Sequence, residues 1–341
     1  MAISTDDLIA RRSVDVLKQG QSASGAFVAS PSFPTYHYAW LRDGAFCAHA
    51  LDLAGERESA LAFHEWAARS VEAHRSLVEG AIAEVGAGRT PPPEAMPPAR
   101  YTLDGSLERS DDEPWPNFQP DGYGMWLWAL GEHVDGNVLP DGWSETVELV
   151  ARYLQATWQL KCFSCWEELD GGEHASTLGA VAAGLNAAAR LLDDERWAAE
   201  AGRAKAHLLD RFVHGDRFGR GPADDPRIAA TVAAIQNELV GPSGGLYRYR
   251  GDTYYGGGEW ILLACSLGWH AALAGDRETL ARAREWVRAQ AGANGDLPEQ
   301  VTTAAQAPDM VEPWLRRWGP VATPLLWSHA MYLIMEHAAG G

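Results

Sequence analysis

Apolar residues recur at spacings of three and four along nearly the whole chain, and this periodicity limits the possible folds more than any other feature. The spacing places apolar side chains on one face of a helix. Alternating runs long enough for a β-sheet are absent from the sequence. We therefore expect an all-α protein, with helices at residues 6–18, 45–54, 58–85, 124–132, 145–160, 175–192, 195–212, 227–240, 260–274, 277–291 and 324–337.

A short joint between helices recurs in the chain. Residues 53–58 and 273–278 are nearly identical, and residues 191–196 are a looser copy. Each is apolar before the turn and charged after it, which is typical of a tight connection between antiparallel helices. Gly55 and Gly275 stand where a left-handed residue closes a helix, and Pro324 is expected as the first residue of the last helix.

Long connections alternate with these tight turns. We expect them at residues 19–38, 86–119, 161–174, 213–226, 241–258 and 292–309. Long loops in a compact domain are usually functional. In a closed ring of helical hairpins they would gather on one face. No Pro-rich linker or composition shift divides the chain, so residues 1–341 are predicted to form a single domain.

Two glutamates stand in such long connections, within Cys165-Trp166-Glu167-Glu168 and Leu297-Pro298-Glu299-Gln300. Hydrolysis of a glycosidic bond requires two carboxyl groups, one that protonates the leaving oxygen and one that activates water or attacks. The alternative is that both are ordinary surface glutamates, since charged residues are mostly exposed.

Three further segments carry polar and aromatic residues suited to a sugar. Arg42 and Asp43 follow Trp40, and an arginine beside a carboxylate can bind neighbouring hydroxyls, although a structural salt bridge is as good an explanation. The segment from Trp115 to Asp121 offers an aromatic ring, amides and a carboxylate, or a plain ordered loop. The segment 248–260 is rich in Tyr and Gly, but it lacks the Lys-Ser/Thr ending of a phosphate-binding loop.

Composition sets further limits. The net charge of −18 opposes binding to nucleic acid or anionic lipid, and the 15 Trp residues suit either sugar rings or a core. No leader or membrane span is expected, so a reducing cytoplasmic location is predicted. Cys162 and Cys165 lack a second ligand pair at zinc-finger spacing, so neither a metal nor a cofactor is expected.

Taken together in their order along the chain, these segments resemble the catalytic domain of glycoside hydrolase family 15, the glucoamylase family. The resemblance extends from Tyr36 to Tyr332. The resemblance implies an (α/α)6 toroid and an inverting exo-glucosidase that releases glucose from the non-reducing end. The β-sandwich and starch-binding module that many members carry have no counterpart here, which favours short oligosaccharides. Family members cleave α-1,4 and α-1,6 bonds and trehalose, so the linkage stays open, with α-1,6 at least as plausible as α-1,4.

The resemblance also assigns roles. Glu167 matches the general acid and Glu299 the general base. The expected sugar-binding residues are Tyr36, Trp40, Arg42, Asp43, Trp115, Asp121, Trp166, Glu168, Arg248 and Trp327. Core packing is the alternative for Trp327, in the segment Trp327-Ser328-His329.

The inverting mechanism makes physical demands on the two carboxyls. Glu167 has to be protonated, through burial or neighbouring carboxylates, and Glu299 has to be ionised. They should lie about 6.5–9.5 Å apart to admit a water. Two alternatives remain: a phosphorylase or epimerase of the same architecture, and a non-catalytic sugar-binding protein. An epimerase would place histidines at the ring centre, whereas His37, His49, His174 and His329 are scattered.

Overall fold

The computed structural model describes residues 8–108, 115–136, 139–168, 171–212 and 226–340. Its helices are α1 (Leu8–Gln19), α2 (Leu41–Leu53), α3 (Arg57–Ala73), α4 (Arg75–Gly86), α5 (Pro120–Val134), α6 (Trp143–Thr157), α7 (Ala175–Leu192), α8 (Glu195–Phe212), α9 (Pro226–Leu239), α10 (Ile261–Ala274), α11 (Arg277–Gln290), α12 (Val311–Trp318) and α13 (Leu326–Gly340). The strands, each of two residues, are β1 (Ala39–Trp40), β2 (Arg100–Tyr101), β3 (Glu259–Trp260) and β4 (Gln300–Val301).

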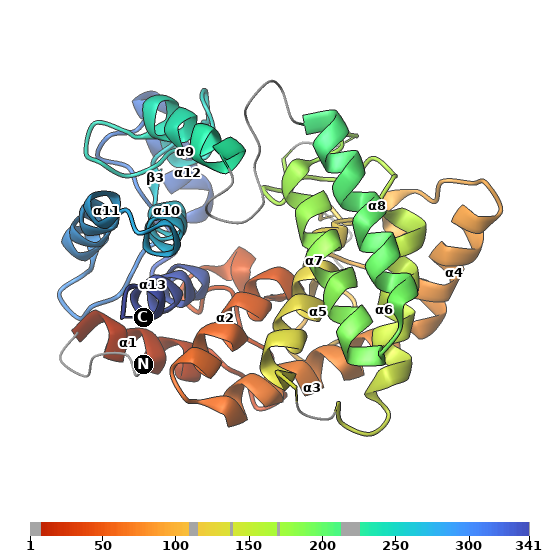
Figure 1. Cartoon of the computed structure of the whole chain (residues 1–341). Helices are drawn as coiled ribbons and strands as arrows, with labels where there is room; N and C mark the ends of the chain where they lie inside the picture. The colour runs from red at the N-terminus through yellow and green to blue at the C-terminus, as the bar shows by residue number, and fades with distance from the viewer. Residues whose placement is uncertain (1–7, 109–114, 137–138, 169–170, 213–225, 341) are drawn as a thin grey trace.

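The helices form two layers that curve around a common axis (Figure 1). Along the inner layer, α7 packs on α5, α5 on α2, α2 on α13 and α13 on α10. Behind them lie α8 against α7, α6 against α7, α3 against α2, α1 against α13 and α11 against α10. The first and last helices, α1 and α13, therefore meet (Figure 1). This arrangement confirms the predicted all-α toroid.

The inner helices approach one another closely because glycines stand at their crossings. A Cβ on Gly124 of α5 would lie 2.5 Å from the carbonyl oxygen of Ala180 of α7. A Cβ on Gly184 of α7 would lie 2.6 Å from the carbonyl oxygen of Gly124. Backbone therefore packs against backbone here, which a larger residue would prevent.

Most predicted helices are confirmed within a few residues, two expectations are wrong, and one helix was missed. The stretch 58–85 is two helices, α3 and α4, which meet at His74. Helix α12 was not predicted. Pro324 is not the first residue of the last helix, because α13 begins at Leu326, after a cis Thr323–Pro324 bond. Gly55 and Gly275 do adopt the left-handed conformation, with φ of 86° and 74°.

One helix among the described residues, α7, is long and apolar enough to cross a membrane by length and composition alone. It packs between α5, α6 and α8, and half of its apolar window is buried inside the protein. Burial between neighbouring helices explains the apolar composition of α7 as that of a core helix.

Candidate active site

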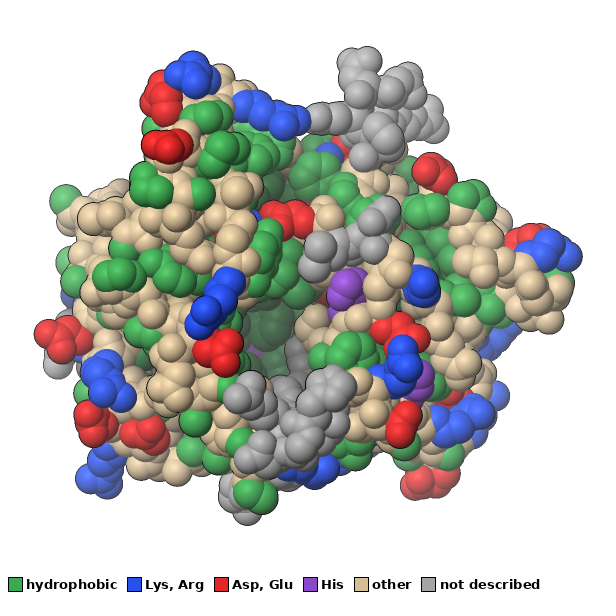
Figure 2. Space-filling model, turned by 90° about the horizontal axis from the view of Figure 1, so that it is seen from above, with side chains coloured by type: hydrophobic (Ala, Val, Ile, Leu, Met, Phe, Trp, Pro, Cys, Tyr) green, Lys and Arg blue, Asp and Glu red, His purple; other side chains and the backbone are tan. Residues whose placement is uncertain are grey.

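A pocket of about 330 Å³ opens at one end of the ring. Its volume lies at the small end of the range of roughly 300–1,000 Å³ for small-molecule sites. Figure 2, seen from above, shows a hollow near the middle of this face with hydrophobic side chains inside it. Predicted long connections supply most of the lining, including Tyr36, Trp115, Glu167, Arg248 and Glu299. Their predicted convergence is thus confirmed for these five connections, while most of 213–226 lies outside the described residues.

Two pairs of short strands hold these connections in place. β1 pairs with β2, which fixes Trp40 opposite Arg100. β3 pairs with β4, which fixes Trp260 opposite Gln300, the residue after Glu299. The backbone N–H of Glu299 also donates to the carbonyl of Ala322 at 2.9 Å. The two strand pairs therefore hold the loops in place at the N-terminal ends of the inner helices α2 and α10.

Glu167 is held in a fixed orientation. Its backbone has a φ of 63°, which is costly for a residue other than glycine, by about 1–3 kcal/mol. Its Oε1 accepts hydrogen bonds from Trp40 Nε1 at 2.7 Å, Trp115 Nε1 at 3.0 Å and Gln119 Nε2 at 3.1 Å. Because these donors all bind Oε1, Oε2 is the oxygen left to hold and give up a proton.

Glu299 has a more secluded environment. The residue is only 2% exposed, and its Oε1 accepts from the hydroxyl of Tyr36 at 2.9 Å, which in turn lies 2.9 Å from the hydroxyl of Tyr254. Its Oε2 is buried and has no hydrogen-bond partner in the described protein. That oxygen is free to accept from a water molecule.

Burial raises the pKa of Glu299 from its ordinary 4.5 to about 7, although the Tyr36 hydrogen bond and the positive charge of Arg248 lower it. The sequence predicts that Glu299 is the base and is ionised. Burial works against the ionised form, so Glu299 titrates near neutrality, a pKa that suits a general base, and its role stays a prediction.

Arg42 anchors one end of the pocket. Its Nη1 donates to Gln119 Oε1 at 2.9 Å and to Asp121 Oδ2 at 3.0 Å. Its Nε lies 3.5 Å from Asp43 Oδ1, and burial raises the pKa of Asp43 to about 7 against the opposing charge of Arg42. Arg42 and Asp43 line the pocket as predicted, but Asp121 does not. That Asp121 binds sugar stays a prediction; in the structure its Oδ2 accepts a hydrogen bond from Arg42 and fixes the guanidinium.

Arg248 is held in place on the other side of the pocket. Its Nη2 lies 2.6 Å from Glu168 Oε1 and 2.7 Å from Asp252 Oδ1, and its guanidinium lies over the rings of Trp166 and Trp260 at 5.4 and 4.9 Å. Asp252 is fully buried, while Glu168 keeps a side-chain exposure of 34%. Glu168 and Arg248 can therefore both present polar atoms to a ligand, and Asp252 holds Arg248 from behind.

The segment Trp327-Ser328-His329 divides between pocket and core. Trp327 lines the pocket, stacked on Phe46 with ring centroids 5.5 Å apart. Ser328 donates to the carbonyl of Pro298 at 2.8 Å, and His329 Nε2 accepts from the N–H of Leu297 at 2.9 Å. The last two therefore hold the loop that carries Glu299. Trp327 thus lies at the pocket wall rather than in the core, which favours the pocket prediction over core packing, and its contact with sugar stays a prediction.

Several lining residues were not among the predicted sugar-binding residues: Tyr254, Trp260, Trp314, Arg317 and Trp318. Trp314 and Trp318 belong to α12. Their spacing of four was a signal, since it puts both rings on one face of a helix.

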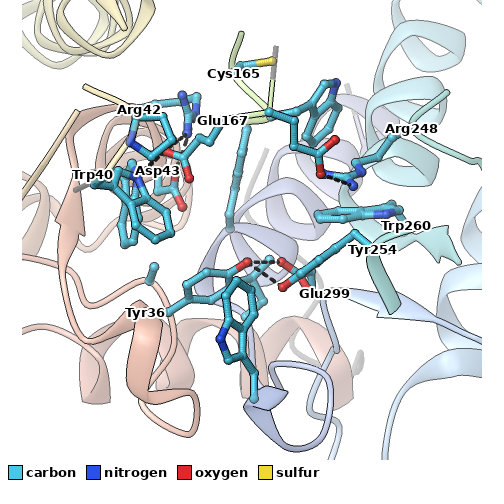
Figure 3. Close-up of a pocket in the computed structure, with 18 of the residues that line it drawn as sticks. Tyr36, Trp40, Arg42, Asp43, Cys165, Glu167, Arg248, Tyr254, Trp260 and Glu299 are labelled. Carbon is cyan, nitrogen blue, oxygen red and sulfur yellow. Dashed lines mark hydrogen bonds and ion pairs between the residues drawn. The ribbon is translucent and has the colours of Figure 1, made fainter. Parts of the chain in front are cut away.

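The side chains converge on one space. Figure 3 shows Glu167 beside Trp40 and Asp43, and Glu299 beside Tyr36 and Tyr254 on another side of the pocket. Aromatic faces close the walls between them, and such faces suit the C–H surfaces of sugar rings. The site can thus present a proton donor and a proton acceptor to a single small ligand. The predicted separation of the carboxyls stays a prediction.

Comparisons with known proteins agree with this geometry. The family model "Glycosyl hydrolases family 15" matches residues 5–206. Isomaltose glucohydrolase of Kribbella flavida is 39% identical over 97% of this chain and 92% of its own. A glycosidase variant in complex with glucose is 36% identical, with a TM-score of 0.90 over 99% of each chain. Glucoamylase from Saccharomycopsis fibuligera, 16% identical with a TM-score of 0.71 over 99% of this chain and 96% of its own, shares the fold.

Proposed function

We propose the following function for this chain, which belongs to glycosyl hydrolase family 15. The protein is a glycoside hydrolase, an exo-acting α-glucosidase. Within that class we propose an inverting enzyme that releases β-glucose from the non-reducing end of short α-glucosides, with isomaltose as the favoured substrate. The relative named isomaltose glucohydrolase supports the α-1,6 bond, and the glucose complex of the similar glycosidase supports glucose as the product.

The observation that carries the proposal is the difference between the two carboxyls of the pocket. Glu167 offers only Oε2 for a proton, because donors occupy Oε1. Glu299 offers an unpartnered Oε2 to water. In a single displacement, Glu167 protonates the leaving oxygen while Glu299 removes a proton from the attacking water, so the anomeric carbon inverts.

The other lining residues place the sugar between these groups. The guanidinium of Arg42 and the carboxyl of Asp43 would bind neighbouring hydroxyls of the terminal ring. Trp40, Trp115 and Trp327 would contact its faces. Holding the ring in one orientation contributes to catalysis by itself.

The first experiment is a substrate screen by glucose release from isomaltose, maltose, panose, trehalose and short dextrins. We expect isomaltose to give the highest kcat/KM. If maltose or trehalose exceeds it, the linkage assignment is wrong. Release that requires inorganic phosphate would identify a phosphorylase instead.

The second experiment follows the anomers. An NMR time course should show β-glucose first and α-glucose only as the sugar mutarotates. Appearance of the α-anomer first would refute inversion. Glu167→Gln and Glu299→Gln should each abolish turnover while isomaltose still binds by calorimetry, and Glu278→Gln, an exposed change on α11, serves as the matched control.

A reducing location in the cytoplasm remains part of the proposal. All four cysteines are free thiols, which supports it. A periplasmic or secreted fraction of the activity in the native host would contradict it.

A further inference from the structure

The inner helices α2 and α5 are joined at both ends. At the pocket end, Arg42 of α2 binds Asp121 of α5 at 3.0 Å. At the other end, Asp52 in the last turn of α2 lies 2.9 Å from His133 Nδ1 in the last turn of α5. Ten residues of helix separate Arg42 from Asp52, which corresponds to about 15 Å. The second junction is therefore remote from the sugar pocket, whose lining includes neither Asp52 nor His133.

A third side chain, His64 of α3, completes this junction. His64 is fully buried, and its ring centroid lies 5.0 Å from that of His133. Neither of its ring nitrogens has a hydrogen-bond partner in the described protein. A neutral imidazole has one N–H to donate and one lone pair to offer, and burying both without a partner is unfavourable. The ring nitrogens of His64 therefore call for a partner from outside the protein, such as a bound ion or a water molecule.

The three side chains have the composition of a metal site. Asp52, His64 and His133 each direct one ligand atom so that these atoms all lie within 4.8 Å of one another. Two imidazole nitrogens and one carboxylate oxygen are donors that suit Zn²⁺, whose bonds to nitrogen are about 2.0–2.1 Å long.

Two of the three donors are already in contact. His133 Nδ1 lies 2.9 Å from both Asp52 Oδ1 and Asp52 Oδ2, so a bound ion would take the place of the proton in this hydrogen bond. Arg57 lies 3.7 Å from Asp52 Oδ1 and donates a hydrogen bond to the carbonyl oxygen of His133 at 2.7 Å, while its side chain is 54% exposed. Arg57 therefore borders the junction on its solvent side.

We propose that Asp52, His64 and His133 bind one zinc ion that ties the last turns of α2 and α5 to α3. His49, three residues before Asp52 on α2, has a buried and unpartnered Nδ1 but does not belong to this group of three, so water would complete the coordination of the ion. The ion stabilises the end of the helix ring opposite the sugar pocket. It takes no part in glycoside hydrolysis.

The test uses the full chain without an affinity tag, treated with a chelator and dialysed. Titration with Zn²⁺ by calorimetry should show one site per chain with a Kd in the micromolar range or tighter, and native mass spectrometry should show the same stoichiometry. Zn²⁺ should raise the Tm, whereas Mg²⁺ and Ca²⁺, which prefer oxygen ligands, should not. Absence of Zn²⁺ binding in this range would overturn the proposal and leave His133 hydrogen-bonded directly to Asp52.

Two variants locate the ion. Asp52→Asn keeps the size of the side chain and should weaken Zn²⁺ binding at least about tenfold. His270→Gln removes a half-buried histidine of α10 that lies outside the junction and should leave the affinity unchanged. Circular dichroism of the metal-free Asp52→Asn protein verifies that it folds. Unaltered binding by folded Asp52→Asn would place the ion elsewhere and overturn the assignment, as would loss of binding in His270→Gln.

As a second measurement, Co²⁺ in place of Zn²⁺ reports the ligand geometry through its visible absorption. We expect the intense bands of a tetrahedral site in the wild-type protein and their loss in Asp52→Asn. The weak bands of an octahedral, mostly aqueous ion would contradict the proposed ligand set.

Discussion

Replacing Glu299 with glutamine should stabilise the protein in a strongly pH-dependent way. The carboxyl is 2% exposed, and burial raises its pKa from 4.5 to about 7. Ionising this group in the folded protein therefore costs more free energy than ionising it in the unfolded chain. Glutamine has a similar shape and cannot ionise, so Glu299→Gln removes this cost.

The magnitude follows from the two pKa values. A raised pKa gives a stabilising contribution that is complete below pH 4.5 and is lost as the pH rises through about 7. At about 1.36 kcal/mol per pH unit, the loss amounts to roughly 3 kcal/mol. Wild type should therefore lose roughly 3 kcal/mol relative to Glu299→Gln between pH 4.5 and pH 8. Any fixed cost of the amide, such as an unpaired N–H beside Tyr36, cancels in this comparison.

Urea denaturation at pH 4.5, 6, 7 and 8 measures the free energy of unfolding of both proteins. Glu278→Gln, whose parent side chain is 81% exposed, is the matched control and should follow the wild type at every pH. A difference between wild type and Glu299→Gln that stays constant from pH 4.5 to pH 8 would refute the claim that burial sets the pKa of this base.

Three further changes test separate parts of the structure. Tyr36→Phe removes a donor that stabilises the ionised base, so the acid limb of the kcat/KM profile should move to higher pH in a pH-rate measurement. Trp40→Phe removes one of the donors to Oε1 of the acid and should lower kcat/KM by about tenfold in initial-rate assays. Gly44→Ala places a Cβ 2.1 Å from the ring of Phe63, so urea denaturation should show a loss of about 1–3 kcal/mol.

The helical fold could be predicted because amphipathic periodicity is a local property. Helices α7 and α8 have the predicted bounds. The break at His74 has no Pro or Gly to mark it, so periodicity ran through it. No element was predicted for residues 311–318, where α12 lies. A proline in the first turn of a helix loses no intrahelical hydrogen bond, and Pro313 lies there.

The candidate site could be predicted as a set of residues but not as an arrangement. Motif positions identified the carboxyls, Arg42 and Arg248, because their neighbours in sequence carry the resemblance. The contact of Asp121 with Arg42 could not be predicted, because a residue in the first turn of a helix can face either the pocket or a neighbouring side chain, and tertiary packing decides which. The junction of Asp52, His64 and His133 joins three helices, so no sequence spacing could reveal it.

The environments of the two carboxyls explain how one residue type can serve two roles. The left-handed backbone of Glu167 costs free energy, and the indole and amide donors on its Oε1 offset that cost while fixing the carboxyl plane. Glu299 has the opposite character, with a single hydroxyl donor and a buried free oxygen. A carboxyl plane fixed through Oε1 is useful to a group that must deliver a proton from Oε2 along one line. A desolvated oxygen is useful to a group that must take a proton from water, because burial makes it more basic. The residues that surround each glutamate therefore determine which of the two proposed roles it can fill. Substitution of these surrounding residues should lower catalytic activity, as substitution of the glutamates themselves should.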